Sequence, residues 1–506
     1  MSKPTFFADN WDRFGGRASA IFSCYVMSQR LDCNFSFFWP DDPRVPGMED
    51  QVNFFSPEFL QAHRVFQQPS PRDCVTVNVG QFTLNQAKDF VEDFESEVFL
   101  KFSDFFALPQ FLDDTKEEAL SHYSRIALSS MNSELRTLFK DISDQKKNVI
   151  TVHGRFGDLL NGDFCQYVPI NKYIDTISFR VLLDNFTNSS ENLEFFSDTP
   201  AVVTGLEKHS GLKLQYASDF LDAAQDKTNF AEQWFDLFSI ASSAHIFAAP
   251  SSAFSTFAAK LGGKQTSEVR SKLLESPIQR ALALDYKSHY AAFDDSIRHA
   301  LEARDISNLL QIHWMHLDFS NVRALAKRSY LADRNYVFAS CVWAVIKYLE
   351  GFTGQALNIL KNAESQAQKV RDTHHDPLAV VLLTKYCLAA YSDDDSQKSI
   401  LSKLQDLVPL QFYFAPFLTS WESRIGNSLL KEHHSSRRSL RTLFGRRKLF
   451  VADLWGVVQK LNSNRSLYLL PWNEVLETNQ NEFLYSILEM LMAEKLRGQY
   501  SHHSRP

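Results

Sequence analysis

Short apolar runs alternate with amphipathic stretches over the first half of the chain. Runs rich in β-branched and aromatic residues, typical of strands, lie at 5–8, 34–39, 74–79, 149–152, 193–196, 214–217 and 245–248. Apolar residues at helical spacing fill a segment that ends near residue 31 and others at 84–94, 117–139, 169–183, 200–209, 231–242 and 252–261. Segment 40–68 reads as irregular and 103–113 as a loop. Strands that alternate with helices predict an α/β fold with right-handed crossovers and parallel sheets.

The pattern changes near residue 281, after which only helical spacing is found. A chain of 506 residues is too long for one ordinary core. We therefore expect three domains: 1–145 and 146–280, both α/β, and a helical domain at 281–506. Paired-helix repeats and an irregular helical bundle are equally compatible with the last domain, because no clean repeat period is present.

Polar residues follow three of the expected strands at the point where each strand stops. His153, Arg155 and Asp158 follow the strand at 149–152, in a loop that contains Gly154 and Gly157; Ser197-Asp198 and Ser251-Ser252 follow two later strands. The carboxyl ends of parallel strands face one crevice, so these side chains are expected to meet there. The alternative for Arg155 and Asp158 is an ion pair that only closes a surface loop.

Two of these positions suit an anionic ligand. The guanidinium of Arg155 can hold two phosphate oxygens at once, and Ser251-Ser252 opens a helix whose first N–H groups are free to donate. A turn at Gly15-Gly16-Arg17, between the first strand and its helix, adds bare backbone and a cation. The alternatives are an ordinary serine N-cap and a plain tight turn.

Composition excludes several classes of protein. The net charge of −7 argues against nucleic acid as a partner, and six scattered cysteines without a CxxC pair disfavour a zinc site or a disulfide framework. Neither a signal peptide nor a membrane-spanning run is evident, so we expect a cytoplasmic protein. The basic segment 431–450 interleaves Leu and Phe, which suits either the inner face of an anionic membrane or an exposed loop.

Three stretches resemble the GDP-fucose-dependent fucosyltransferases of the α1,2, α1,6 and protein-O type. They are VHGRFGDLLNGD at 152–163, EFFSD at 194–198 and AEQWFDLFSIASSAHIFAAPSSAFSTFAAKLGG at 231–263. The resemblance is one of pattern and spans about residues 10–265. It implies a GT-B fold, with two Rossmann-like domains ahead of the helical domain, the first facing the acceptor and the second binding the nucleotide sugar.

The resemblance also implies roles for individual residues. Arg155 would hold the diphosphate, and His153 would support the nucleotide loop. Ser251 and Ser252 would bind phosphate, Asp198 and Asp236 would contact guanine or ribose, and Gly15, Gly16 and Arg17 would contribute to donor binding. The base is expected to be Asp158 or Asp163. Phe156 stands where many relatives have a second arginine, and Leu159 stands where a basic or aromatic residue is frequent.

The implied reaction is transfer of fucose from GDP-fucose, with inversion and without a metal or other cofactor. The acceptor would be a glycan, a lipid-linked glycan or a protein. The alternative is a non-catalytic interaction protein, in which the helical domain does the binding and the nucleotide-sugar site is vestigial.

Overall fold

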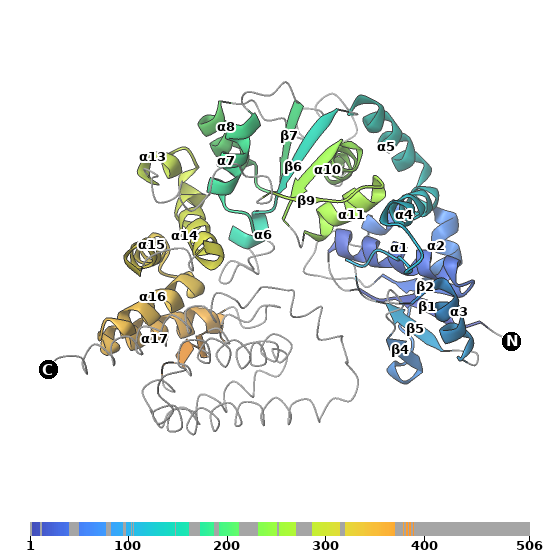
Figure 1. The fold of residues 1–506 in the computed structure, drawn as a ribbon, viewed down its shortest axis with the longest axis horizontal. Coiled ribbons are helices and arrows are strands. Elements are labelled where there is room, and N and C mark those ends of the chain that lie inside the picture. Colours follow the sequence, from blue (N-terminus) through green and yellow to red (C-terminus); the bar gives the residue numbers. More distant parts are fainter. Residues whose placement is uncertain are drawn as a thin grey trace, which may run out of the picture. The chain divides into compact units, whose positions relative to one another are not determined.

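The computed structural model forms two compact units (Figure 1). The first contains Met1–Arg155 and Arg180–Leu274, and the second contains Phe156–Phe179 and Glu275–Pro506. The chain therefore leaves the first unit between Arg155 and Phe156 and returns at Arg180. The structure describes residues 3–10, 13–39, 50–76, 82–94, 98–102, 104, 106–146, 148–160, 173–186, 192–211, 231–249, 252–269, 286–313, 319–369, 378, 381–382, 384–385 and 388.

A five-stranded parallel sheet forms the N-terminal part of the first unit. Its strands are β1 (Thr5–Ala8), β2 (Asn34–Phe38), β3 (Arg64–Val65), β4 (Cys74–Thr76) and β5 (Phe99–Phe102), in the order β3-β2-β1-β5-β4. The central strand β1 pairs with β2 on one side and with β5 on the other. The chain order of the strands thus reverses at β1, where ligands bind in open α/β sheets.

The helices of this part are α1 (Phe14–Arg30), α2 (Pro57–His63), α3 (Leu84–Glu92), α4 (Lys116–Ser130) and α5 (Ser133–Gln145). Three expectations were wrong. Segment 40–68 contains α2, which Ser56 caps by accepting from the N–H of Phe59. Strand β5 was missed, and the helix expected at 117–139 is broken at Asn132, whose side chain caps α5.

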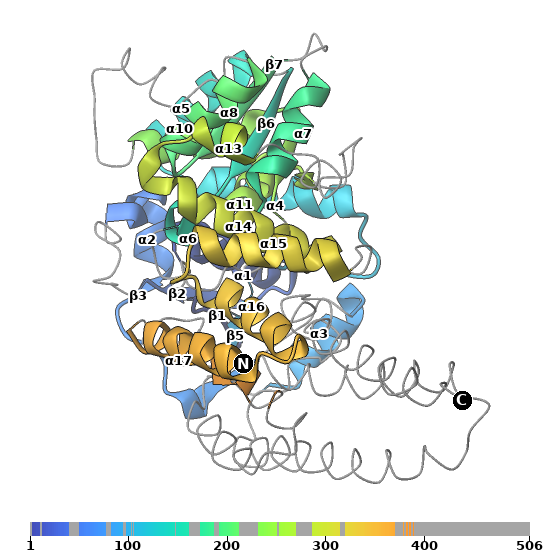
Figure 2. The same ribbon diagram turned by 90° about the vertical axis from the view of Figure 1, so that its left-hand side faces the viewer.

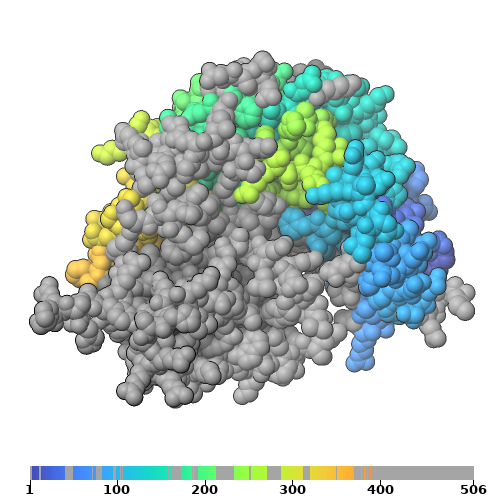
Figure 3. All heavy atoms as spheres, viewed as in Figure 1, coloured from blue at the N-terminus to red at the C-terminus, as the bar shows by residue number. Residues whose placement is uncertain are grey.

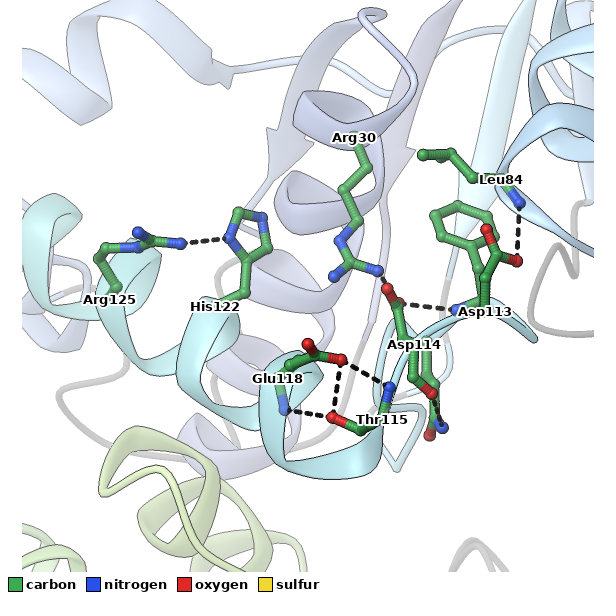
Figure 4. Close-up of polar contacts among 10 residues, drawn as sticks. Arg30, Leu84, Asp113, Asp114, Thr115, Glu118, His122 and Arg125 are labelled. Atoms are coloured by element: carbon green, nitrogen blue, oxygen red, sulfur yellow. Dashed lines mark hydrogen bonds and ion pairs between the residues drawn. The ribbon is translucent and has the colours of Figure 1, made fainter.

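Figure 4 shows how α1 and α4 are held together at their ends. Arg30, in the last turn of α1, pairs with Asp114, just before α4. Thr115 caps α4 by accepting from the N–H of Glu118 at 3.2 Å, and the Glu118 carboxylate accepts from the N–H of Thr115 at 2.9 Å. This reciprocal cap satisfies two backbone donors that a helix terminus leaves free.

A second parallel sheet of four strands completes the first unit. Its strands are β6 (Val149–Gly154), β7 (Asn192–Ser197), β8 (His245–Ala248) and β9 (Ser267–Glu268), in the order β7-β6-β8-β9. The helices that follow these strands are α6 (Gly157–Leu160), α7 (Thr176–Phe186), α8 (Pro200–Ser210), α10 (Ala231–Ser242) and α11 (Ala253–Leu261). The helix expected from 169 begins at Thr176, and the strand expected at 214–217 lies outside the described residues.

An aromatic core joins the two halves of the first unit. Phe14 of α1 contacts Trp234 of α10 with ring centroids 4.8 Å apart, and Phe22 of α1 stacks on Phe257 of α11 at 6.0 Å. Helix α11 also packs on α4, and their atoms adjoin on the face seen in Figure 3. Many of the 43 phenylalanines thus have a structural use, since the core between the helices of the two sheets is built largely of rings.

The described part of the second unit is helical beyond residue 285. Its helices are α13 (Tyr286–Ala291), α14 (Asp295–His313), α15 (Phe319–Ala332), α16 (Val337–Leu349) and α17 (Thr353–Lys369), and from α13 to α17 each packs on the next (Figure 2). None of the described helices is long and apolar enough to cross a membrane. The basic segment 431–450 lies outside the described residues.

Candidate functional site at the carboxyl edge of the second sheet

The three polar strand ends belong to three adjacent strands. Gly154 at the end of β6 lies opposite Ser197 at the end of β7, and His153 lies opposite Ala248 at the end of β8. Arg155, Asp198 and Ser252 therefore follow neighbouring parallel strands, as the sequence predicted. The carboxyl edge of this sheet is the place where a doubly wound α/β fold holds its ligands.

A chain of short polar contacts runs from β6 into the first turn of α11. His153 Nδ1 lies 2.6 Å from Ser255 Oγ, and Ser255 Oγ lies 2.9 Å from Ser252 Oγ. Ser252 is the N-cap of α11, and its hydroxyl accepts from the N–H of Ser255 at 3.4 Å. All three side chains are buried. Rotamers locked by burial and hydrogen bonds give this edge a fixed shape.

Burial and, as the smaller cause, the charge of Arg155 lower the pKa of His153 to about 4. His153 is therefore neutral at neutral pH, while Arg155 keeps its charge at any working pH. A neutral ring can exchange a hydrogen bond with Ser255 and sit near a guanidinium without repelling it. The positive charge at the end of β6 is thus carried by Arg155.

Helix α11 directs its N-terminus toward the same edge of the sheet. The first N–H groups of a helix have no acceptor inside the helix, and the dipole places partial positive charge there. Arg155 and the start of α11 thus supply a cation and backbone N–H donors after adjacent strands β6 and β8. This arrangement can bind a phosphate or a diphosphate.

Gly15 brings α1 to the same helix terminus. A Cβ at Gly15 would lie 2.7 Å from Phe254 Cα and 2.9 Å from Phe254 N, so only glycine allows this approach of α1 to α11. The expectation of a Gly15-Gly16-Arg17 turn was wrong, because α1 begins at Phe14 and includes all three residues. Arg17 is 1% exposed, and its guanidinium lies over Trp39, with the carbon 5.5 Å from the ring centre.

The remaining candidates are placed as follows. Asp198 is exposed and accepts from Thr199 Oγ1 at 3.4 Å, and Asp236 lies half-buried in α10. Asp158 lies in α6, while Asp163 and Ser251 lie outside the described residues. Among the residues that the structure does describe, no group of three or more His, Cys, Asp or Glu side chains could hold a metal ion.

The motifs in the sequence gave Ser255 no role, although the spacing of Ser252 and Ser255 contained a signal. An N-cap serine and a hydroxyl three residues later lie on one side of the first helical turn. The partner of Ser255 could not be read from the sequence, because His153 lies 102 positions away. The close approach at Gly15 is likewise a property of the fold.

Comparisons with known proteins find matches among solved structures. No protein-family model and no curated protein matches this chain. Among solved structures, POFUT1 in complex with GDP-fucose is 13% identical, over 53% of this chain and 96% of that chain, with a TM-score of 0.32. The fucosyltransferase NodZ from Bradyrhizobium is 14% identical, over 51% and 93%, with a TM-score of 0.28.

A third match is a NodZ alpha-1,6-fucosyltransferase soaked with GDP-fucose, 12% identical over 52% of this chain and 93% of that chain, with a TM-score of 0.28.

Proposed function

We propose that this chain is a glycosyltransferase that moves a sugar, fucose in the first place, from a GDP-sugar to a hydroxyl acceptor with inversion. One observation carries the proposal. Arg155 directly follows a strand whose buried, neutral His153 is hydrogen-bonded into the N-terminal turn of α11. A fixed cation and a helix N-terminus therefore follow adjacent strands, which is what a nucleoside diphosphate requires.

The same groups account for the chemistry. Displacement at the anomeric carbon leaves negative charge on the departing GDP, and preorganised donors that stabilise this charge lower the barrier. Arg155 and the first turn of α11 carry this role. Asp198 and Asp236 are assigned to guanine or ribose, and either Asp158 or Asp163 is assigned to deprotonate the acceptor hydroxyl. The acceptor is a glycan, a lipid-linked glycan or a protein.

The alternative is an interaction protein whose working part is the helical unit. The two functions differ in what they require of the nucleotide. An enzyme of this kind must prefer GDP to ADP and UDP, because a guanine pocket is part of its donor site. An interaction protein with a vestigial site has no reason to distinguish them.

Calorimetry on the full chain with GDP, ADP and UDP tests the proposal. We expect GDP to bind most tightly and Arg155→Ala to weaken it by roughly ten- to a hundredfold, the effect of losing a charge-assisted hydrogen bond worth about 1.5–3 kcal/mol. The GDP affinity of Arg155→Lys should lie between those of the wild type and Arg155→Ala, because lysine keeps the charge but lacks the planar guanidinium. In a transfer assay with GDP-fucose, Arg155→Ala should be inactive while remaining folded.

Arg136→Ala is the matched control. Arg136 lies exposed on α5, so this variant makes the same change of charge away from the site and should bind GDP as the wild type does. Equal affinity for all three nucleotides, or unchanged GDP binding by Arg155→Ala, would reject the assignment.

A further inference from the structure

A buried carboxylate stands at the carboxyl edge of the first sheet. Asp9 directly follows the central strand β1 and is 4% exposed. Its Oδ2 lies 2.6 Å from the ammonium of Lys101 on β5, and its Oδ1 accepts from the side-chain amide of Gln68 at 3.0 Å. Gln68 comes after β3. Three parts of the sheet therefore direct polar side chains to one point, on the edge where α/β folds place their ligands.

This cluster opens to solvent, unlike an ion pair that is enclosed in a core. The side chain of Lys101 is 34% exposed and Gln68 is exposed, while the carboxylate between them is buried. An ammonium has three N–H donors, and a side-chain amide has two donors and a carbonyl acceptor. Both groups therefore have hydrogen-bonding capacity beyond their contact with Asp9. A hydroxyl group suits such a mixed set, because it donates and accepts at once.

An exposed aromatic ring belongs to the same edge. Phe66 directly follows β3 and is 80% exposed, and Gln68 in the same short stretch reaches Asp9. The guanidinium of Arg64 lies over the ring, with its carbon 5.0 Å from the ring centre. A cation stacked on one face holds the ring in place. Most of the surface of Phe66 is still in contact with water, where a ligand can cover it.

A second exposed ring follows the neighbouring strand, on backbone that is held from two sides. Phe106 comes after β5 and is 40% exposed. Asp104 Oδ1 accepts from the N–H groups of Phe106 and Ala107, at 2.8 and 3.2 Å. The carbonyl of Ala107 accepts from Ser23 Oγ and Lys260 Nζ, at 2.9 and 2.8 Å. A side chain that projects from backbone fixed in this way is preorganised for binding.

We propose that the carboxyl edge of the first sheet binds a carbohydrate. Asp9, Lys101 and Gln68 hydrogen-bond to its hydroxyl groups, and Phe66 and Phe106 pack on the apolar faces of its rings. A sugar ring has both kinds of surface, because it carries C–H groups on its faces and hydroxyl groups around its rim. Sites for small ligands are built in the same way, from aromatic side chains and a few placed polar groups.

The position of this edge makes the carbohydrate the acceptor, and in this respect the inference rests on the proposed function. The residues after β1 lead into α1, and Gly15 near the start of α1 lies against the backbone of Phe254 in the first turn of α11. The carboxyl edge of the first sheet is therefore connected, within one compact unit, to the helix N-terminus that we assign to the diphosphate. Among the proposed acceptors, a glycan fits this edge better than a polypeptide.

Saturation-transfer NMR on the full chain with cellobiose, lactose and mannobiose tests the site. We expect at least one of these disaccharides to bind. Gln68→Ala should weaken its binding by roughly two- to tenfold, the effect of losing one neutral hydrogen bond, and Phe66→Ala by a similar factor through the lost ring contact. Asp9→Asn should weaken it by about tenfold or more, because hydrogen bonds to a charged group are stronger.

Asp32→Asn is the matched control. Asp32 pairs with Lys3 as Asp9 pairs with Lys101, but Lys3 and Asp32 precede β1 and β2 and so lie at the amino edge of the same sheet. This variant makes the same chemical change at the opposite edge and should bind the disaccharide within twofold of the wild type. Because Phe66 and Gln68 are exposed, their alanine variants should fold normally and keep the test valid if Asp9→Asn is unstable.

Two results would overturn the carbohydrate site: none of the three disaccharides binds, or neither Gln68→Ala nor Phe66→Ala weakens binding. Fucose transfer to an unglycosylated polypeptide by a protein that binds no disaccharide would identify a polypeptide acceptor instead. The two proposals fail separately. Disaccharide binding that depends on these residues, without a preference for GDP over ADP and UDP, supports the carbohydrate site and rejects the transferase. A preference for GDP without disaccharide binding does the reverse.

Discussion

Lys260 is a buried cation whose removal should make the protein more stable. It lies on α11, is 4% exposed, and its Nζ donates to Ser19 Oγ at 3.1 Å and to the carbonyl of Ala107 at 2.8 Å. The ammonium also lies 5.4 Å from the ring centre of Tyr123. These contacts join α11 to α1 and to the loop after β5.

The size of the effect follows from the pKa. Burial lowers the pKa of Lys260 from 10.5 to about 7, and the more distant charge of Asp104 raises it only in part. At about 1.4 kcal/mol for each pH unit, keeping this lysine charged costs the folded state roughly 5 kcal/mol relative to the unfolded chain. Between pH 7 and 10.5 the unfolded chain holds a proton that the folded chain has released, so the free energy of unfolding rises with pH across this window.

Lys260→Met keeps a side chain of similar length and removes the charge. The variant loses the hydrogen bonds to Ser19 and Ala107, worth about 1–2 kcal/mol together, but the Ala107 carbonyl still accepts from Ser23 Oγ at 2.9 Å. We therefore expect the free energy of unfolding at pH 6 to rise by about 2–4 kcal/mol. The gain over the wild type should shrink by about 2–3 kcal/mol at pH 9, where the wild-type lysine is neutral in the folded state.

Urea unfolding followed by tryptophan fluorescence at pH 6 and pH 9 measures both quantities. Lys264→Met is the control, because Lys264 is half-buried but donates to the carbonyls of Ala241, Ser242 and Ser243 at the end of α10. That variant should lose about 1 kcal/mol, since the cation stabilises a helix C-terminus. A Lys260→Met protein that is less stable than the wild type at pH 6, or whose difference from the wild type is the same at both pH values, would refute the reasoning.

Two further substitutions test the site. Gly15→Ala places a Cβ within 2.7 Å of the Phe254 backbone, so it should lower the free energy of unfolding by about 1–3 kcal/mol and weaken GDP binding in calorimetry. Gly354→Ala, which meets open space in α17, should be neutral or stabilising by up to about 1 kcal/mol; equal effects of the two would disprove the close contact. His153 has its pKa lowered from 6.5 to about 4, so the unfolded chain binds a proton there that the folded chain does not, and stability is lost as the pH falls from 6.5 toward 4. His153→Gln should reduce that loss by about 2–3 kcal/mol in urea unfolding, and an unchanged pH dependence would contradict a buried neutral histidine.

The local sequence pattern was sufficient to predict the bounds of a helix or strand wherever its apolar residues follow a clear periodicity. Strands β1 and β8 and helix α10 begin and end where the pattern placed them. The strands are short and mostly apolar, and residues 237–242 of α10 are all buried. In such segments the residues that form the element are also those that bury it, so propensity and packing agree.

The pattern failed where capping residues or long-range pairing decide the structure. Helix α2 is only seven residues long and begins at a Ser56-Pro57 cap inside a segment rich in proline and aspartate. Strand β5 includes Lys101, whose ammonium pairs at 2.6 Å with the buried Asp9 at the end of β1. A charged residue breaks the apolar run, and the buried carboxylate that it pairs with is far away in the sequence.

The sequence predicted which strand ends form the candidate site, but it did not predict the hydrogen bonds among their side chains. Arg155, Asp198 and Ser252 could be grouped because parallel strands present their carboxyl ends along one edge. Only the order of strands and helices is needed to group them. The bond between His153 and Ser255 needs the register of β6 against β8 and the start of α11, which no local pattern encodes. For the same reason the sequence did not predict the hydrogen bond between the N–H of Thr176 and Asp305, which lie 129 positions apart.

Phe156 shows how a departure from a motif can carry information about the fold. Many fucosyltransferases that the motif resembles have a second arginine at this point, and an arginine there would supply another cation to the donor. Here the position is fully buried between Tyr173 and Phe179 of the second unit. An arginine would bury an unpaired charge among rings, at a cost of several kcal/mol. In the proposed function Arg155 therefore holds the diphosphate without a second arginine beside it in the chain.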